Sequence, residues 1–181
     1  MKKLLIIVDM QNDFITGSLA NKDAQAIVDP ICQYLTENKN NFEEVVLTRD
    51  THKEDYLKTP EGKKLPVEHC IHGTPGWCVH DKIRDTLKTL NIPHAYIDKT
   101  TFGYKYWGSY GEGIQGYNGD VIEICGTCTD ICVVSNALIL KNEFPKKEIR
   151  ILSNLCAGLT PELHQAALDV MKSCQCEITK G

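Results

Sequence analysis

The chain has 181 residues, of which 42% are hydrophobic and 24% charged, and its formal net charge is −4. This length suits one globular domain over residues 1–181 with a full core, and the slight negative charge gives no reason to expect a nucleic acid or an anionic membrane as a partner. The nine cysteines are many and odd in number, but the chain is too long to need disulfide bonds and carries no secretory pattern. We therefore expect reduced thiols in a cytoplasmic protein.

Short apolar runs, typical of strands, alternate along the chain with segments of helical periodicity. The predicted strands are residues 4–8, 44–47, 95–97, 121–124, 148–152 and 175–178. The predicted helices are residues 24–35, interrupted near Pro30, then 81–90, 131–141, and 161–172 with Thr160 as its cap. This alternation favours a six-stranded, mainly parallel, doubly wound α/β sheet with helices on both faces.

Two candidate reactive residues directly follow predicted strands. Asp9 follows the first strand and precedes a loop that contains Phe14, and Lys99 follows the third strand. Reactive groups of open α/β sheets gather at the carboxyl ends of strands, although a turn aspartate is an equally good interpretation of Asp9. Tyr104 and Trp107, a few residues beyond Lys99, either wall a small-molecule pocket or pack beneath the loop.

A candidate metal-binding group follows the second strand. Asp50 and His52 lie at its end, and the long polar segment of residues 53–80 then carries Glu61 and His69. A segment of this length is usually functional, and Asp and His side chains bind zinc, manganese or iron. The Asp-x-His spacing is a weak pattern by itself, since surface histidines and loop carboxylates explain it more often.

The stretch of residues 121–137 combines a strand, a glycine turn and a helix start. The side chains expected to cap this helix are Thr127, Thr129 and Asp130. Cys132 then falls in the first helical turn, where the positive end of the helix dipole favours a lowered thiol pKa and free N–H groups can hold an oxyanion. The alternative is that these are ordinary buried cysteines.

Asp9, Lys99 and Cys132 follow three different strands and make chemical sense together. A carboxylate can take the proton of a thiol and pass it to a leaving amine, and an ammonium group favours the thiolate and the charge that develops during attack. Two rival functions stay open: a non-catalytic metabolite-binding protein on the same fold, and a thiol-redox protein built on Cys125 and Cys128.

Three motifs in this order, Asp9-Met-Gln-Asn-Asp-Phe14, Lys99 and Gly126-Thr-Cys-Thr-Asp-Ile-Cys-Val133, resemble the isochorismatase-like cysteine hydrolases, which include the nicotinamidases. The resemblance implies that Asp9, Lys99 and Cys132 form a catalytic triad. It implies an oxyanion hole made by the backbone N–H groups of Cys128 and Cys132, and a cis peptide bond between Thr127 and Cys128. A homodimer or homotetramer is implied as well.

Nicotinamidases of this superfamily bind a divalent metal, and the resemblance implies that Asp50, His52 and His69 are its ligands here. Glu61 is the expected fourth ligand, with Asp55 in reserve. The ion, which would be zinc, manganese or iron, is implied to hold the ring nitrogen of the substrate. No organic cofactor is implied.

The resemblance also implies a substrate and a pocket. Many nicotinamidases have Tyr where this chain has Ile131, and Trp where it has Leu65, so we expect Phe14 with Trp107 or Tyr104 to supply the aromatic surface. The expected reaction is hydrolysis of the C–N bond of a small primary amide through a cysteine thioester, with nicotinamide giving nicotinate and ammonia. A related amidase or carbamoyl hydrolase for another small amide is the alternative.

Overall fold

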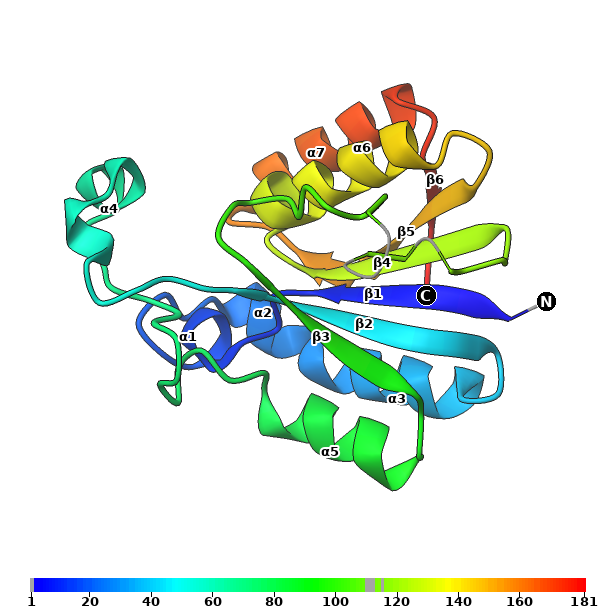
Figure 1. Cartoon of the computed structure of the whole chain (residues 1–181), viewed down its shortest axis with the longest axis horizontal. Helices are drawn as coiled ribbons and strands as arrows, with labels where there is room; N and C mark the ends of the chain where they lie inside the picture. Colours follow the sequence, from blue (N-terminus) through cyan, green and yellow to red (C-terminus); the bar gives the residue numbers. More distant parts are fainter. Residues whose placement is uncertain (1, 110–112, 115) are drawn as a thin grey trace.

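The computed structural model describes residues 2–109, 113–114 and 116–181. A six-stranded sheet runs through the molecule in the order β3-β2-β1-β4-β5-β6, and all of its neighbouring strands are parallel. Figure 1 shows this sheet between two layers of helices. The predicted doubly wound α/β fold is confirmed.

The strands are β1 (Lys3–Val8), β2 (Phe42–Asp50), β3 (His94–Lys99), β4 (Val121–Thr127), β5 (Glu148–Ala157) and β6 (Glu177–Thr179). β1 is buried from its second residue onward and β4 likewise, as expected of central strands that are covered on both faces. β2 extends three residues beyond its predicted end, because Thr48, Arg49 and Asp50 pair in register with β3. That pairing carries Asp50 to the carboxyl edge of the sheet, directly beside Lys99.

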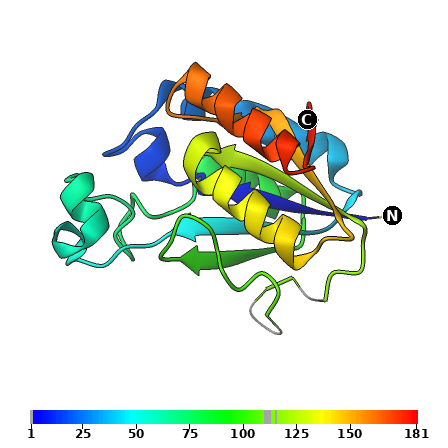
Figure 2. The same ribbon diagram turned by 90° about the horizontal axis from the view of Figure 1, so that it is seen from above.

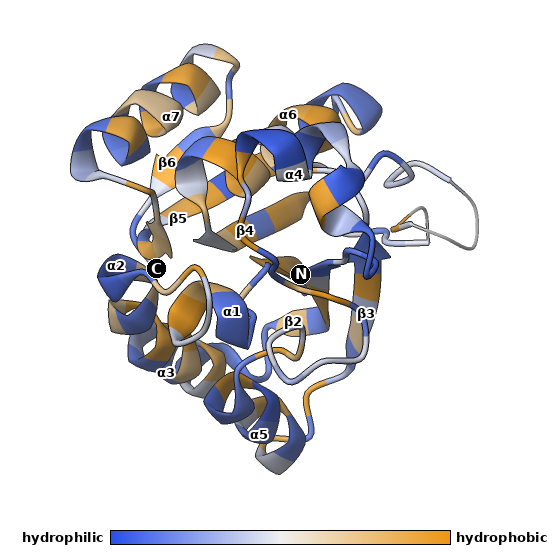
Figure 3. Cartoon of the chain, turned by 90° about the vertical axis from the view of Figure 1, so that its left-hand side faces the viewer, coloured by the Kyte–Doolittle hydropathy of each residue, from blue (hydrophilic) through white to orange (hydrophobic). Residues whose placement is uncertain are grey.

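The helices are α1 (Asn12–Ile15), α2 (Lys22–Ala26), α3 (Val28–Asn38), α4 (Pro60–Lys64), α5 (Asp81–Thr89), α6 (Val134–Glu143) and α7 (Pro161–Ser173). α3 and α5 cover one face of the sheet, and α6 and α7 cover the other (Figures 1 and 2). Hydrophobic and hydrophilic residues alternate along α3, α5 and α7 (Figure 3), which is the pattern of helices packed on one side. Within the part of the chain that the structure describes, none of the helices is long and apolar enough to cross a membrane.

The predicted interruption of the first helix is confirmed, and it separates α2 from α3. α2 ends at Ala26 and α3 begins at Val28, so the break falls at Ile27 rather than near Pro30. Pro30 lies in the first turn of α3, where a missing N–H leaves no intrahelical hydrogen bond unmade. The predicted cap of α7 is confirmed, because the Thr160 side chain accepts a hydrogen bond from the N–H of Leu163.

Residues 53–80 form an arm with short helices of its own. The arm contains the 3₁₀ turn η1 (Tyr56–Lys58) and α4, which project from the body of the molecule (Figure 1). It returns alongside the end of β2, where the N–H of His52 donates to the carbonyl of Cys70. The N–H of Cys70 in turn donates to the Asp13 carboxylate at 2.7 Å. These bonds bring the second half of the arm, including His69, back to the sheet edge.

Candidate active site

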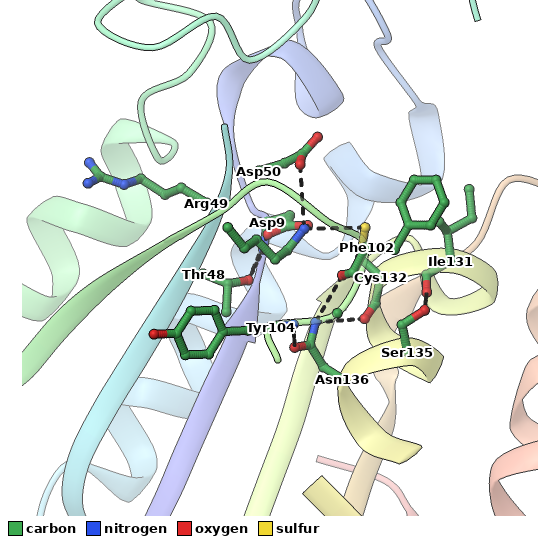
Figure 4. Close-up of polar contacts among 12 residues, drawn as sticks. Asp9, Thr48, Arg49, Asp50, Phe102, Tyr104, Ile131, Cys132, Ser135 and Asn136 are labelled. Carbon is green, nitrogen blue, oxygen red and sulfur yellow. Dashed lines mark hydrogen bonds and ion pairs between the residues drawn. The ribbon is translucent and has the colours of Figure 1, made fainter. Parts of the chain in front are cut away.

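The strand order makes β1 and β4 neighbours, and the helices that follow them leave to opposite faces of the sheet. The crevice at such a switch point is where ligands bind in open α/β sheets. Asp9 follows β1, and Cys132 lies just beyond β4; Figure 4 shows the two side chains pointing toward one another. Gly126 permits the close approach of the two strands, because its φ is +117° and a Cβ there would collide with the carbonyl oxygen of Val8.

Asp9, Lys99 and Cys132 are in mutual contact, as the sequence predicted. Nζ of Lys99 lies 2.6 Å from Oδ2 of Asp9 and donates to Sγ of Cys132 at 3.6 Å. All three side chains are buried, and Lys99 is only 2% exposed. Oδ2 of Asp9 is thus paired with the ammonium group, and the Cys132 thiol lies within hydrogen-bonding reach of the same carboxylate.

Burial and charge set the protonation of these three groups. Burial, reinforced by the Asp9 carboxylate, raises the pKa of Cys132 well above its usual value, although Lys99 opposes the rise. Burial opposes the charge on Lys99, but the carboxylates of Asp9 and Asp50 and the Cys132 sulfur raise the pKa of its ammonium group. The lowered thiol pKa expected for a helix start is wrong, because that argument considered only the backbone dipole. Burial and the Asp9 carboxylate thus favour the neutral thiol over the thiolate.

The turn that carries Cys132 begins with a cis peptide bond between Thr127 and Cys128, as the resemblance implied. Residues Thr129–Val133 then form a π-helical turn that leads into α6. The predicted capping is wrong: Cys128 precedes the turn, and neither Thr127, Thr129 nor Asp130 caps it. The hydroxyl of Thr129 instead pairs with Nδ1 of His164 on α7, at 2.8 Å.

Two buried polar residues that the sequence analysis did not select hold the site in shape. The hydroxyl of Thr48 donates to Oδ1 of Asp9 at 2.6 Å (Figure 4). The side chain of Gln11 donates to the carbonyl of Asp50 at 2.8 Å and accepts from its N–H at 2.7 Å. Gln11 belongs to the first motif of the resemblance, but no feature of the sequence distinguishes Thr48 from any other strand threonine.

Asp50, His52 and His69 converge as predicted, and the structure places them beside Lys99. Oδ2 of Asp50 lies 3.0 Å from Nε2 of His52 and 3.5 Å from Nε2 of His69. The three ligand atoms all lie within 4.8 Å of one another, and no other group of His, Cys, Asp or Glu side chains among the described residues has this arrangement.

The chemistry of this cluster fits a divalent metal. Nδ1 of His69 lies 2.8 Å from the carbonyl oxygen of Val67, which only accepts, so Nδ1 carries the proton and Nε2 presents its lone pair to the cluster. Two atoms bound to one zinc ion at about 2.1 Å lie roughly 3.0 to 3.5 Å apart, and the distances from Asp50 to the two histidines fall in this range. Burial opposes the ionisation of Asp50, but the contacts with both histidines and the charge of Lys99 hold its pKa below the usual range.

Glu61 lies at the edge of this cluster. Its Oε1 is 3.8 Å from Nε2 of His52, and its side chain is partly exposed on α4. Asp55, the reserve candidate, is an exposed residue that precedes η1 and lies outside the cluster. The geometry therefore favours Glu61 over Asp55 as a fourth ligand.

A cavity of about 200 Å³ connects the thiol to the metal cluster. Cys128, Cys132, Asp50, Glu61 and His69 all line it. Its apolar lining is Phe14, Leu19, Leu65, Phe102, Ile131 and Leu159. The volume is below the roughly 300 Å³ at which pockets for drug-sized ligands begin, so the cavity suits a small and largely apolar molecule.

The predicted aromatic lining is correct for Phe14 but wrong for Trp107 and Tyr104, which do not line this cavity. Trp107 is 0% exposed and donates its indole N–H to Oδ1 of Asn136 at 2.9 Å. Tyr104 packs edge-on against the Trp107 ring. The chain beyond β3 thus turns these rings into the core, and the neighbouring Phe102, which is 49% exposed, supplies the wall instead.

A thiol, an ammonium group and a carboxylate in contact at the switch point of a doubly wound sheet define an α/β cysteine hydrolase. The isochorismatase domain family matches residues 3–181, and the chain belongs to this family. The nicotinamidase/pyrazinamidase of Mycobacterium tuberculosis is 31% identical over 195 positions, which cover 97% of each chain.

Two solved structures extend this comparison. The nicotinamidase/pyrazinamidase of Bacillus subtilis superposes with a TM-score of 0.83 at 27% identity, covering 99% of this chain and 100% of that one. The pyrazinamidase of Pyrococcus horikoshii in complex with zinc superposes with a TM-score of 0.76 at 26% identity, covering 100% of both chains. The chain is therefore similar over its full length to amidases of this family.

Proposed function

We propose that this protein is an amidase that hydrolyses nicotinamide, or a closely related small aromatic amide, to the acid and ammonia. The observation that carries the proposal is that Cys132, Asp9 and Lys99 are in contact at a small apolar cavity that also reaches the Asp50, His52 and His69 cluster. Similarity to the nicotinamidase/pyrazinamidase of Mycobacterium tuberculosis over nearly the whole chain supports the choice of substrate.

The reaction begins with proton transfer, because burial and the Asp9 carboxylate favour the neutral thiol. Asp9 takes the proton of Cys132 as Sγ attacks the amide carbon, so the S–H bond breaks while the S–C bond forms. The hydroxyl of Thr48 holds Asp9 in place through Oδ1, which leaves Oδ2 for the proton. The Lys99 ammonium stabilises the negative charge that develops on sulfur and oxygen.

The negative charge on the amide oxygen requires hydrogen-bond donors. The turn that carries Cys132, here called the nucleophile turn (residues 127–133), supplies them. Among the described residues the N–H of Cys128 has no backbone acceptor, and we assign it with the N–H of Cys132 to the oxyanion hole. Asp9 then gives its proton to the amine nitrogen, and ammonia leaves. Water, deprotonated by Asp9, cleaves the thioester, and the proton returns to the thiolate of Cys132.

The metal cluster orients the substrate at the other side of the cavity. We propose Asp50, His52 and His69 as the ligands, with Glu61 as a fourth, and the zinc complex of the Pyrococcus horikoshii pyrazinamidase supports zinc among the candidate ions. A divalent ion held by these residues would supply a Lewis acid for the ring nitrogen of an azine amide. Phe14, Ile131 and Phe102 then confine the ring.

The test is ammonia release from nicotinamide and from a panel of aliphatic and aromatic amides, with and without chelator and added zinc, manganese or iron. We expect turnover of nicotinamide that the chelator suppresses, and no turnover in Cys132→Ala, with its unfolding transition retained. If the Cys132→Ala protein released ammonia at the wild-type rate, the proposed mechanism would be wrong. Turnover of other amides but not of nicotinamide would keep the mechanism and replace the substrate.

We also propose that the protein acts in the cytoplasm as a homodimer or homotetramer, without nucleic acid or membrane partners. All nine cysteines are free in the described structure, which supports a reducing compartment. Leu163 and Val170, two helical turns apart on α7, are both about half exposed, which supports a subunit contact on that face. Sedimentation equilibrium of the wild type and of Val170→Glu tests the assembly, since a monomeric wild type would exclude it.

A further inference from the structure

Asn136 is a fully buried polar residue of α6, one helical turn beyond Cys132. Its Nδ2 donates to the carbonyl oxygens of Cys132 at 2.8 Å and Phe102 at 3.3 Å. Its Oδ1 accepts from the backbone N–H of Tyr104 and from the indole N–H of Trp107, both at 2.9 Å. Figure 4 shows the side chain between the nucleophile turn and the chain beyond β3. One amide group therefore links the helix of the nucleophile to the segment of residues 102–107.

That segment carries Phe102, one wall of the cavity. Phe102 lies beyond the end of β3, so sheet hydrogen bonds do not place it. The next residue, Gly103, lies against α6 so closely that a Cβ would collide with the side chain of Ile139 and would be in tight contact with Ser135. Since the Phe102 ring is half exposed and its carbonyl is bound by Asn136, the position of this wall depends on contacts with α6.

We propose that Asn136 is a positioning residue that fixes Phe102 against the substrate ring and thereby sets the affinity of the cavity for the amide. This proposal rests on the proposed function. It adds that a residue without any contact to the substrate controls how tightly the cavity binds the substrate ring. Asn136 acts on binding through Phe102, whereas the groups that move protons keep their own partners, Thr48 and Lys99.

The Asn136→Ser variant tests the two sets of hydrogen bonds separately. A serine hydroxyl in a helix reaches the carbonyl four residues earlier, as Ser135 does to Ile131 at 2.6 Å in this same helix. The variant thus keeps a bond to the Cys132 carbonyl and loses the bonds to the 102–107 segment. We expect KM for nicotinamide to rise at least about fivefold while kcat stays within about twofold, the pattern of lost substrate binding.

Asn136→Asp gives a second, isosteric variant. One carboxylate oxygen can still accept from Tyr104 and Trp107, but the other replaces the donor and faces the carbonyls of Cys132 and Phe102, which only accept. At pH 8 we expect the same rise in KM. Phe102→Ala should raise KM by a similar factor, and the Phe102→Ala/Asn136→Ser double variant should show no further rise, because both changes remove the same wall.

Asn38→Ser is the matched control. Asn38 on α3 makes the same type of bond, from Nδ2 to the carbonyl of Tyr34 four residues earlier, at 3.1 Å. This variant should leave KM and kcat unchanged. If Asn136→Ser folds with wild-type KM, or if its effect and that of Phe102→Ala simply add, the proposal is wrong.

Hydrogen exchange keeps the test independent of turnover. The Tyr104 amide should exchange at least about tenfold faster in Asn136→Ser than in the wild type or in Asn38→Ser, because its acceptor is gone. A wild type without any amidase activity would refute the proposed function and leave this measurement valid. Unchanged exchange across residues 102–107 would refute the positioning role whatever the activity.

Discussion

Asp50 contacts Lys99 with one carboxylate oxygen and His52 of the metal cluster with the other. Oδ1 lies 3.6 Å from Nζ of Lys99, and Oδ2 lies 3.0 Å from Nε2 of His52. The negative charge of Asp50 also reaches the nucleophile, where it adds to burial and to Asp9 in raising the pKa of Cys132. Asp50 is thus a predicted metal ligand that also influences the protonation of the thiol.

Asp50→Asn should therefore lower the pKa of Cys132, because the neutral amide removes a negative charge that disfavours the thiolate. His52→Ala removes a ligand but leaves that charge in place. In chelator-treated protein, we expect alkylation of Cys132, followed by peptide mass spectrometry, to become fast at a lower pH in Asp50→Asn than in His52→Ala. Identical profiles in the two variants would contradict the electrostatic role.

Thr48→Val should move the acid limb of kcat/KM to higher pH. Burial raises the pKa of Asp9, and the hydrogen bond from Thr48 counteracts part of that rise. Without the bond the pKa of Asp9 rises further, so a smaller fraction of the base is ionised at pH 7. We expect the rate there to fall about tenfold, in keeping with the loss of one hydrogen bond to a charged group. Thr51→Val, whose hydroxyl donates to the carbonyl of Arg49, should keep the wild-type profile.

Gly126→Ala should lower the free energy of unfolding by at least about 2 kcal/mol, since alanine is strained at a positive φ and overpacking adds to that cost. The φ of Gly126 is +117°, and the added methyl group would collide with the backbone of Val8. Urea unfolding measures the loss. Gly116→Ala, at a position with open space for a Cβ, should change the stability by less than about 0.5 kcal/mol. If Gly126→Ala were as stable as Gly116→Ala, the close approach of β1 and β4 would not contribute to stability.

His164 should make the protein less stable in mild acid. Burial lowers the pKa of His164, outweighing the nearby charges of Asp130 and Asp23. Because the unfolded chain then binds a proton more readily than the folded one, stability falls as the pH drops from about 6.5 through the folded-state pKa. Urea unfolding at pH 7.5 and pH 5.5 should show a larger loss for the wild type than for His164→Gln. A loss of the same size in the variant would exclude His164 as the cause.

The arrangement of Asp9, Lys99 and Cys132 was predictable from the sequence because parallel strands present their carboxyl ends at one edge. Once the alternation of strands and helices is recognised, residues that directly follow strands must lie near that edge. The grouping of Asp50, His52 and His69 was harder to predict, because His69 belongs to the long arm of residues 53–80. Only the resemblance to a known family indicated that His69 lies beside the other two.

Other features depended on packing that a linear pattern does not contain. An aromatic residue after a strand can face a cavity or the core, and Trp107 faces the core because Asn136 accepts its indole N–H. In the sequence, Asn136 is one polar residue within a predicted helix. Its role becomes visible only in the folded structure, where the segment after β3 packs against that helix. The raised pKa of Cys132 likewise comes from burial and from Asp9, 123 positions earlier in the chain.

The reactive groups come from four adjacent strands, in the order β3, β2, β1 and β4. Lys99 and Asp50 end β3 and β2, whereas Asp9 and Cys132 follow β1 and β4. Contacts of such large sequence separation form late when a chain folds, because long loops must close first. Helices can return early after dilution from denaturant, but catalytic turnover returns only when all four strands have paired in register. Recovered activity is thus a kinetic marker for completion of the central sheet.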